Sequence, residues 1–271
     1  MSWLPLEGAV NGRDVGGLPT VDGRVTRSGV LLRTDNLQDL TPADVALLVD
    51  DLHVRTVLDL RTDGEVHLEG PGPLRERPEV VHHHLTLIPQ GFDGRGAAGQ
   101  EPSDEADVDR AIPDEEQSGP EDMSHYYAGY VSDAPANVAT ALRLLADPAG
   151  GTAVVHCAAG KDRTGVVVAL ALSLAGVTRE AVVADYVRTE ERIGAVRDRL
   201  LSSPTYAHDV GARSLDAMRP HAASMERFLD EVDRRYGGPH GLAMSVGVDE
   251  ETVDRLRARL VRTPPASGAP R

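Results

Sequence analysis

The apolar positions of the chain follow two different periods, which predict strands in some stretches and helices in others. Short apolar or β-branched runs bounded by turn residues predict strands over 15–18, 29–33, 54–60, 80–88 and 152–156. Apolar residues spaced three and four apart predict helices that begin near 42, 125, 135 and 164 and that cover 178–191, 222–236 and 249–261. Strands that alternate with helices, followed by a helical C-terminal portion, favour an α/β fold with a central, largely parallel β-sheet flanked by helices.

The segment 91–122, which is seeded with Gly and Pro, interrupts this order. Between Glu101 and Asp122 it holds ten acidic residues and one basic residue, a net charge of −9. We therefore predict a single domain over 1–262, in which 91–122 is an acidic insertion that forms a loop or a lid. The remaining residues, 263–271, are expected to be a disordered tail.

The composition narrows the classes of function. A net charge of −15 disfavours binding to nucleic acid, and the longest apolar run, 166–175, is too short for stable insertion into a membrane. A single cysteine excludes an internal disulfide, and the first residues show no recognisable signal peptide. We expect a cytoplasmic protein, with export by a route that needs no such signal left open, and the oligomeric state is not predicted.

The one cysteine, Cys157, stands where the strand 152–156 ends and the next helix is about to begin. A loop between a strand and a helix N-terminus directs backbone N–H groups at one point, where the helix dipole also favours an anion. The same field favours the thiolate of Cys157, and the guanidinium of Arg163 fits two phosphoryl oxygens. These residues predict phosphoryl transfer through a phosphocysteine. The predicted phosphate cradle consists of Ala158, Ala159, Gly160, Lys161, Asp162, Arg163 and Thr164.

Other interpretations of this loop explain less of it. A nucleotide-binding loop needs glycine where Val155 stands, and Ser or Thr where Asp162 follows Lys161. A buried structural cysteine accounts for Cys157 alone. A sulfur-transfer enzyme gives no role to the residues from Asp162 to Thr164.

The sequence HCAAGKDRTG at 156–165 resembles the Cys-x5-Arg phosphatases, and the chain is similar to the atypical bacterial tyrosine and dual-specificity phosphatases over nearly its whole length. The further blocks that carry this resemblance are 11–17, 32–37, 59–61 with 65–66, 184–187 and 236–238. The resemblance implies a fold of the protein tyrosine phosphatase type, with 91–122 in the place of that group's helical lid.

The resemblance also implies a role for each residue of the loop. Cys157 would be the nucleophile and Arg163 the phosphate clamp, while Thr164 would hydrogen-bond the sulfur. Asp162 would be the general acid. Lys161 would add positive charge at the pocket floor, as in relatives that accept phosphoinositides. The substrates implied are phosphotyrosine proteins, with phosphoserine, phosphothreonine or phosphoinositides beside them; a phosphate-binding module without turnover is the alternative.

Residues outside the loop leave alternatives open. Asp93 is a second candidate acid, and Asp59 with Arg61 could form a buried ion pair or contact substrate. Arg13 and Asp14 are expected to brace the sheet against neighbouring loops. The run of histidines 82–84 alternates between the two faces of its strand, so we expect no metal site there and no cofactor.

Overall fold

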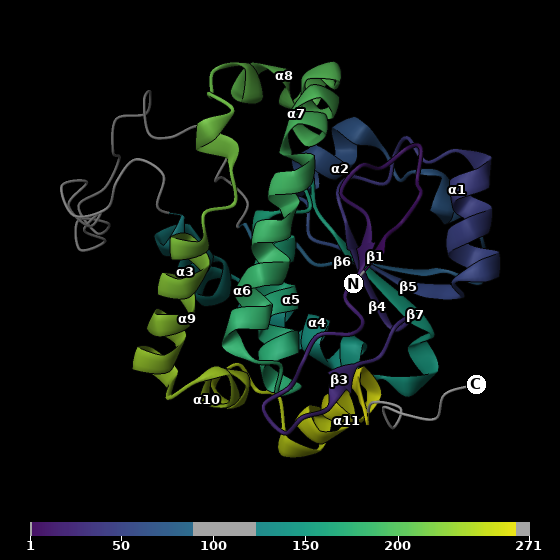
Figure 1. Cartoon of the computed structure of the whole chain (residues 1–271). Helices are drawn as coiled ribbons and strands as arrows, with labels where there is room; N and C mark the ends of the chain where they lie inside the picture. The colour runs from purple at the N-terminus through teal and green to yellow at the C-terminus, as the bar shows by residue number, and fades with distance from the viewer. Residues whose placement is uncertain (1, 89–122, 264–271) are drawn as a thin grey trace, which may run out of the picture.

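A six-stranded sheet forms the centre of the chain in the computed structural model, which describes residues 2–88 and 123–263 (Figure 1). Four parallel strands form the middle and one edge of the sheet, and two antiparallel strands complete the other edge. In spatial order the strands are β1 (Ser2–Trp3), β2 (Arg13–Asp14), β4 (Leu31–Thr34), β7 (Thr152–His156), β5 (Val54–Asp59) and β6 (Val81–His84). A separate antiparallel pair consists of β3 (Val25–Thr26) and β8 (Val261–Arg262).

The four parallel strands end at the same edge of the sheet. In the register Thr34 pairs with His156, His156 with Asp59, and Asp59 with His84. The loops that leave these strands therefore begin side by side. This is the edge at which α/β proteins place their ligands.

One face of the sheet is covered by a helical layer built around α5 (Asp162–Leu174). Ten of the 13 residues of α5 are buried, which explains why this helix is apolar on all sides and not along one stripe. The helices packed against α5 are α3 (Ser124–Asp133), α4 (Pro135–Ala146), α6 (Arg179–Val187), α10 (Pro239–Ser245) and α11 (Glu250–Leu260). Outside them lies α9 (Ala222–Tyr236), which contacts α3, α6 and α10.

The opposite face of the sheet packs on α1 (Pro42–Ala46) and η1 (Leu47–Asp51). Successive residues of β7 point to opposite faces, so Val155 joins the core around α5 while Val154 joins the smaller core on the other side. The remaining short elements are α2 (Asp63–Glu69), η2 (Pro73–Glu76), η3 (Pro148–Gly150), η4 (Arg188–Arg192), α7 (Ile193–Ser202), α8 (Pro204–Gly211) and η5 (Asp216–Met218).

The predicted α/β architecture is confirmed, but several elements differ from their predicted bounds. The stretch 15–18 is a turn and not a strand, because the Asp14 carboxylate accepts the Gly16 N–H and Gly17 has a φ of 85°. The strand predicted over 80–88 is shorter, and α5 begins at Asp162, two residues before the predicted start. Helices α7 and α8 were not predicted. The insertion 91–122 and the tail after Thr263 lie outside the described residues.

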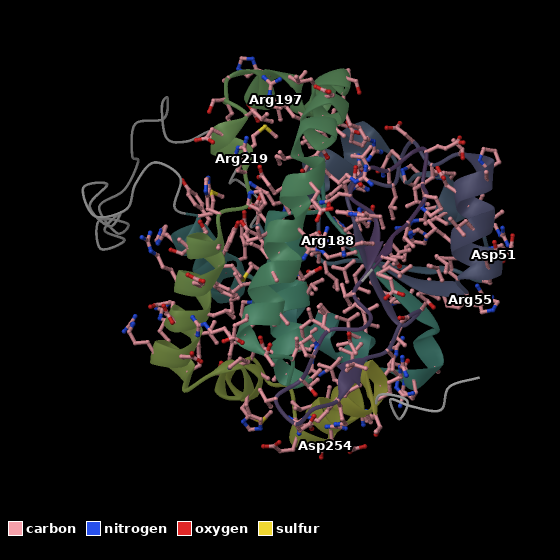
Figure 2. The ribbon with its side chains drawn as sticks, in the orientation of Figure 1. Asp51, Arg55, Arg188, Arg197, Arg219 and Asp254 are labelled. Atoms are coloured by element: carbon pink, nitrogen blue, oxygen red, sulfur yellow. The ribbon has the colours of Figure 1, made fainter. Side chains whose placement is uncertain are left out.

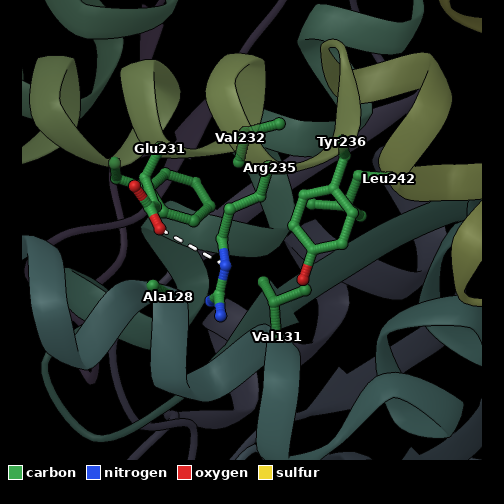
Figure 3. Close-up of a pocket in the computed structure, with 8 residues that line it drawn as sticks. Ala128, Val131, Glu231, Val232, Arg235, Tyr236 and Leu242 are labelled. Atoms are coloured by element: carbon green, nitrogen blue, oxygen red, sulfur yellow. Dashed lines mark ion pairs between the residues drawn. The ribbon is translucent and has the colours of Figure 1, made fainter.

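Two hollows in the described part of the chain lie away from the loop that carries Cys157. The first, between α3, α9 and α10, is lined by Val131, Tyr236 and Leu242, with the Glu231–Arg235 ion pair beside it at 3.4 Å (Figure 3). Its volume of about 10 Å³ is no more than a single water needs. The second, of about 520 Å³, lies at the opposite end of the sheet beside Thr152 and Arg259.

Candidate active site

Cys157 begins the loop 157–163, which joins β7 to the first turn of α5. We call this segment the Cys157 loop. The cysteine is buried, with 2% of its surface exposed. Gly160 has a φ of 65°, and a Cβ at this position would lie 2.4 Å from the carbonyl oxygen of Thr34. The loop therefore turns tightly against the end of β4, at a place where only glycine fits.

The carbonyl groups of the Cys157 loop are bound from outside the loop. The carbonyl oxygen of Ala158 accepts the Asn36 N–H at 3.0 Å, that of Ala159 accepts Asn11 Nδ2 at 2.9 Å, and that of Gly160 accepts Arg33 Nη2 at 2.8 Å. Because each peptide unit directs its N–H group away from its C=O group, outward carbonyls leave the N–H groups for the inner side of the loop. This arrangement is suited to binding an anion, and we call it the cradle.

Three charged residues behind the loop form what we call the buried ionic group: Arg13, Arg33 and Asp185. Asp185 Oδ1 lies 3.0 Å from Arg13 Nε, and its Oδ2 lies 2.6 Å from Arg33 Nη1. Arg13 Nη1 also donates to Asn11 Oδ1 at 2.7 Å, so both side chains that hold loop carbonyls, those of Asn11 and Arg33, are themselves held. Burial, with Arg33 close by, lowers the pKa of Arg13 to about 10. The group keeps a net positive charge behind the cradle.

Arg163 closes the loop and faces Glu65 of α2. Its Nη1 lies 2.5 Å from Glu65 Oε2 and its Nη2 lies 2.9 Å from Glu65 Oε1, and Nη1 also donates to the Leu60 carbonyl at 3.3 Å. Burial alone would lower the pKa of Arg163, but the Glu65 carboxylate outweighs burial and raises it well above its ordinary value. Glu65 also caps α2, because its Oε2 accepts the Thr62 N–H at 2.6 Å. Glu65 thus sets the direction of the Arg163 guanidinium.

Asp162, the first residue of α5, contacts α3 through its Oδ1 atom and is linked to α6 through that contact. That atom accepts the hydroxyl of Tyr127 at 2.5 Å, and the hydroxyl of Tyr127 lies 2.6 Å from that of Tyr186. Lys161 Nζ is 3.5 Å from the same Oδ1 and donates to the Met218 carbonyl at 2.8 Å. The Lys161 ammonium therefore lies beside Asp162 and is hydrogen-bonded to η5.

Asp59 and Arg61 form the buried ion pair that was one of their two predicted roles. Arg61 Nη2 lies 2.6 Å from Asp59 Oδ2, and Arg61 Nε donates to Asp59 Oδ1 at 2.9 Å. His156 Nε2 is 3.6 Å from Asp59 Oδ1, yet complete burial lowers the pKa of His156 to about 4. His156 is therefore neutral at pH 7, although it directly precedes Cys157.

The remaining predicted residues fall in three situations. Thr164 Oγ1 is buried and has no hydrogen-bond partner in the described part of the chain, so the predicted bond to sulfur is not formed here. Arg13 and Asp14 do brace the sheet, since Asp14 binds the N–H groups of Gly16 and Gly29. Asp93 lies outside the described residues. Over residues 2–88 and 123–263, no group of three or more His, Cys, Asp or Glu could hold a metal.

One side of the loop is covered by a segment that was not predicted, residues 193–218, which holds α7, α8 and η5. Figure 2 shows Arg197 and Arg219 beside α7 and α8, on the side of the molecule away from α11. The apolar spacing of α7 and the Ser203 cap before Pro204 were available as signals for these two helices. The apolar cluster that joins this segment to the loop consists of Ala158, Ile193, Val196, Leu200, Tyr206, Val210 and Met218.

Comparisons with known proteins agree with this geometry. The chain is 29% identical over 287 residues to the triple specificity protein phosphatase PtpB of Mycobacterium tuberculosis, covering 96% of this chain and 100% of PtpB. It is 26% identical to a tyrosine-protein phosphatase of Nostoc commune, over 84% of this chain and 73% of that protein. The solved structure of P. aeruginosa TpbA overlaps with a TM-score of 0.33 at 18% identity, over 74% of this chain and 90% of that one, which is too little to bear on the fold.

The sequence model of the tyrosine phosphatase family matches residues 4–262, nearly the whole chain. In the part of the chain that the structure describes, no helix is long and apolar enough to cross a membrane. The matched family is one of tyrosine phosphatases, and both named relatives are protein phosphatases. The chain belongs to the tyrosine phosphatase family, and it is a phosphatase.

Proposed function

We propose that the enzyme hydrolyses phosphate monoesters through a phosphocysteine formed on Cys157. The observation that carries this proposal is the state of the Arg163 guanidinium, which has five N–H donors. Glu65 and the Leu60 carbonyl use three of them. The two that remain, on Nε and Nη2, share one edge of the guanidinium and form a fork for two phosphoryl oxygens, in the loop that Cys157 begins.

The reaction has two steps in this proposal. The Cys157 thiolate attacks phosphorus, the bond to the ester oxygen breaks, and Asp162 gives its proton to the departing oxygen. A water then attacks the phosphocysteine, Asp162 takes a proton from that water, and the bond between sulfur and phosphorus breaks. The loop N–H groups and Arg163 stabilise the charge on the equatorial oxygens in both transition states.

Asp162 and Asp93, the two candidates for the general acid, can be distinguished by how the effect of replacing each one depends on the leaving group. Phenolic leaving groups need little protonation, whereas alkyl leaving groups depart slowly without an acid. Asp162→Asn should therefore reduce turnover of a phosphoserine peptide far more than turnover of p-nitrophenyl phosphate. If Asp93→Asn shows that dependence and Asp162→Asn does not, the assignment is wrong.

The substrate class we propose is phosphotyrosine in proteins, with phosphoserine, phosphothreonine or phosphoinositides as further substrates. The relative named a triple specificity protein phosphatase supports this breadth. The Lys161 ammonium, which lies within 3.5 Å of Asp162, supports the binding of substrates with additional negative charge.

The experiment that tests the proposal compares the wild type with Cys157→Ser on a panel of phosphopeptides and phosphoinositides. The wild type should turn over, and acid quenching should trap a phosphoryl group on Cys157 that mass spectrometry detects. Cys157→Ser should lose turnover but still bind vanadate through the cradle and Arg163. Turnover by Cys157→Ser near the wild-type rate would refute the phosphocysteine.

The wild type has a further outcome on the same panel. Vanadate binding without turnover of any substrate would indicate the alternative, a phosphate-binding module without catalysis. We also propose that no metal or other cofactor takes part, because thiolate, guanidinium and helix N-terminus already supply the nucleophile and the charge stabilisation. Loss of activity in a chelator, restored by zinc or magnesium, would contradict this point.

A further inference from the structure

Two tyrosines outside the Cys157 loop connect its acid to the helical layer. Tyr127 on α3 is completely buried and Tyr186 on α6 is 1% exposed, whereas the Asp162 side chain is 22% exposed. Tyr127 donates its only hydroxyl proton to Asp162 Oδ1, so the bond between the two hydroxyls must be donated by Tyr186. The protons are thus ordered along one chain, from Tyr186 through Tyr127 to Asp162.

The rings of this chain are fixed as firmly as its hydroxyls. A Cβ on Gly165 would lie 3.0 Å from Cδ2 of Tyr186, so the tyrosine ring packs directly on the first turn of α5. The Tyr127 ring meets those of Tyr186 and Phe228 edge to face, with centroids 6.0 and 6.1 Å away. Neither hydroxyl oxygen can therefore move away from its partner unless a helix also moves.

Both hydroxyls stay protonated over the working range of the enzyme. Burial, and then the negative charge of Asp162, raise the pKa of Tyr127 well above its ordinary value, and the same two causes raise that of Tyr186. Tyr127 thus acts as a permanent donor to a carboxylate. Such charge-assisted bonds are short and strong in a buried setting. The hydroxyls hold their protons while the carboxyl group gains and loses one.

The second oxygen of the Asp162 carboxylate is left for the reaction. Oδ1 receives Tyr127 and faces Lys161, while Oδ2 has no hydrogen-bond partner within residues 2–88 and 123–263. We propose that Tyr127, itself held by Tyr186, is a positioning residue that fixes Asp162 with Oδ2 toward the leaving group. This inference rests on the proposed function, in which Asp162 is the general acid.

Loss of the Tyr127 hydroxyl should affect proton delivery by Asp162. Without the Tyr127 hydroxyl the carboxyl group can rotate, so proton delivery should fail most for leaving groups that need it.

The test is Tyr127→Phe, which keeps the ring and removes one oxygen. For a phosphoserine peptide we expect kcat to fall roughly tenfold to a hundredfold, a part of what an acid contributes, while p-nitrophenyl phosphate changes by about twofold or less. KM and vanadate binding should stay near the wild type, which reports an intact loop. Tyr126→Phe, one residue away and 48% exposed, is the matched control and should behave as the wild type.

Tyr186→Phe and a double variant complete the test. Tyr186→Phe should show a smaller loss with the same dependence on the leaving group. Tyr127→Phe combined with Asp162→Asn should be no slower than Asp162→Asn alone, because the tyrosine acts only through the aspartate. If Asp162→Asn shows the leaving-group dependence and Tyr127→Phe does not, this inference is wrong and the proposed function stands. If Asp162→Asn lacks that dependence, the proposed acid itself is wrong.

Discussion

The arginines of the buried ionic group and Arg163 all lie next to the Cys157 loop, but their N–H groups contact different atoms. In the buried ionic group, Arg13 and Arg33 are 0% exposed and donate to Asp185, to side-chain oxygens and to backbone carbonyls. At the mouth of the loop, Arg163 is 11% exposed and keeps two N–H groups that no described residue uses. Arg13 and Arg33 therefore fix the backbone of the loop, whereas Arg163 is itself fixed by Glu65 and the Leu60 carbonyl.

The difference shows how a single loop can be both rigid and ready to bind. Charges buried without water need hydrogen-bond partners, and the carbonyls of the Cys157 loop supply some of them, although Arg33 Nε has no partner among the described residues. The loop is therefore fixed by groups that a substrate never touches. Glu65 fixes Arg163 in the same way but from one side only, so the opposite edge of the guanidinium stays open.

The largest effect on catalysis is expected from Arg163→Lys, which keeps the charge and removes the fork. An ammonium cannot present two parallel N–H groups to two oxygens, so kcat/KM should fall on the order of a thousandfold. Steady-state kinetics with p-nitrophenyl phosphate measure this. Arg234→Lys, at an exposed arginine paired with Glu231, is the control. A variant with more than a tenth of wild-type activity would show that the fork is not needed.

A substitution in the buried ionic group should lower the free energy of unfolding and leave substrate specificity unchanged. Asp185→Asn leaves two buried guanidinium groups without their counter-charge, so we expect the free energy of unfolding to fall by about 3–5 kcal/mol. Urea denaturation measures this loss. Asp230→Asn, at an aspartate that pairs with Arg179 but is 70% exposed, should change it by about 0.5 kcal/mol or less. Equal losses in the two variants would mean that the buried ionic group does not stabilise the fold.

Glu65→Gln tests whether direction, and not charge alone, makes Arg163 effective. Glutamine can still accept one bond from Arg163 and still cap α2, so the fold should survive. The guanidinium loses its second fixed bond, and kcat/KM should fall roughly tenfold to a hundredfold. Kinetics together with a thermal unfolding curve separate the two effects. A kcat/KM within twofold of the wild type would mean that Arg163 is positioned without Glu65.

Whether a contact of the site could be predicted depends on how far apart its two residues lie in the sequence. Cys157 and Arg163 stand in one strand–loop–helix unit, so their proximity follows from local geometry. Glu65 lies 98 residues from Arg163, and Asp185 lies 152 from Arg33. Nothing local indicates that Asp185 is buried between two arginines, because Arg13 on β2 and Arg33 on β4 precede it by 172 and 152 residues.

The same limit applies to the rest of the site. Tyr127 contacts Asp162 across 35 residues of sequence. The length of the insertion before α3 does not predict which residue of that helix faces Asp162. Helix α7, in contrast, had a readable apolar spacing at Ile193, Val196 and Leu200, so it could have been found. The parallel order of the sheet was predictable because strands separated by helices pair in parallel.

His156 offers the smallest and most specific test, since it is a buried titratable group in this region that carries no charge at neutral pH. Its pKa is lowered by burial to about 4 in the folded chain, against 6.5 when exposed. Between these values the unfolded chain binds a proton that the folded chain refuses, so stability is present above pH 6.5 and is lost as the pH falls toward 4. At pH 5.5 this loss should be about 1.4 kcal/mol. Urea denaturation of wild type and His156→Gln at pH 7.5 and 5.5 measures it, because carboxylates common to both proteins cancel in the difference. If the two proteins lose the same stability between these pH values, burial does not keep His156 neutral in the folded chain. A positive charge on His156 would then have to be counted beside Cys157.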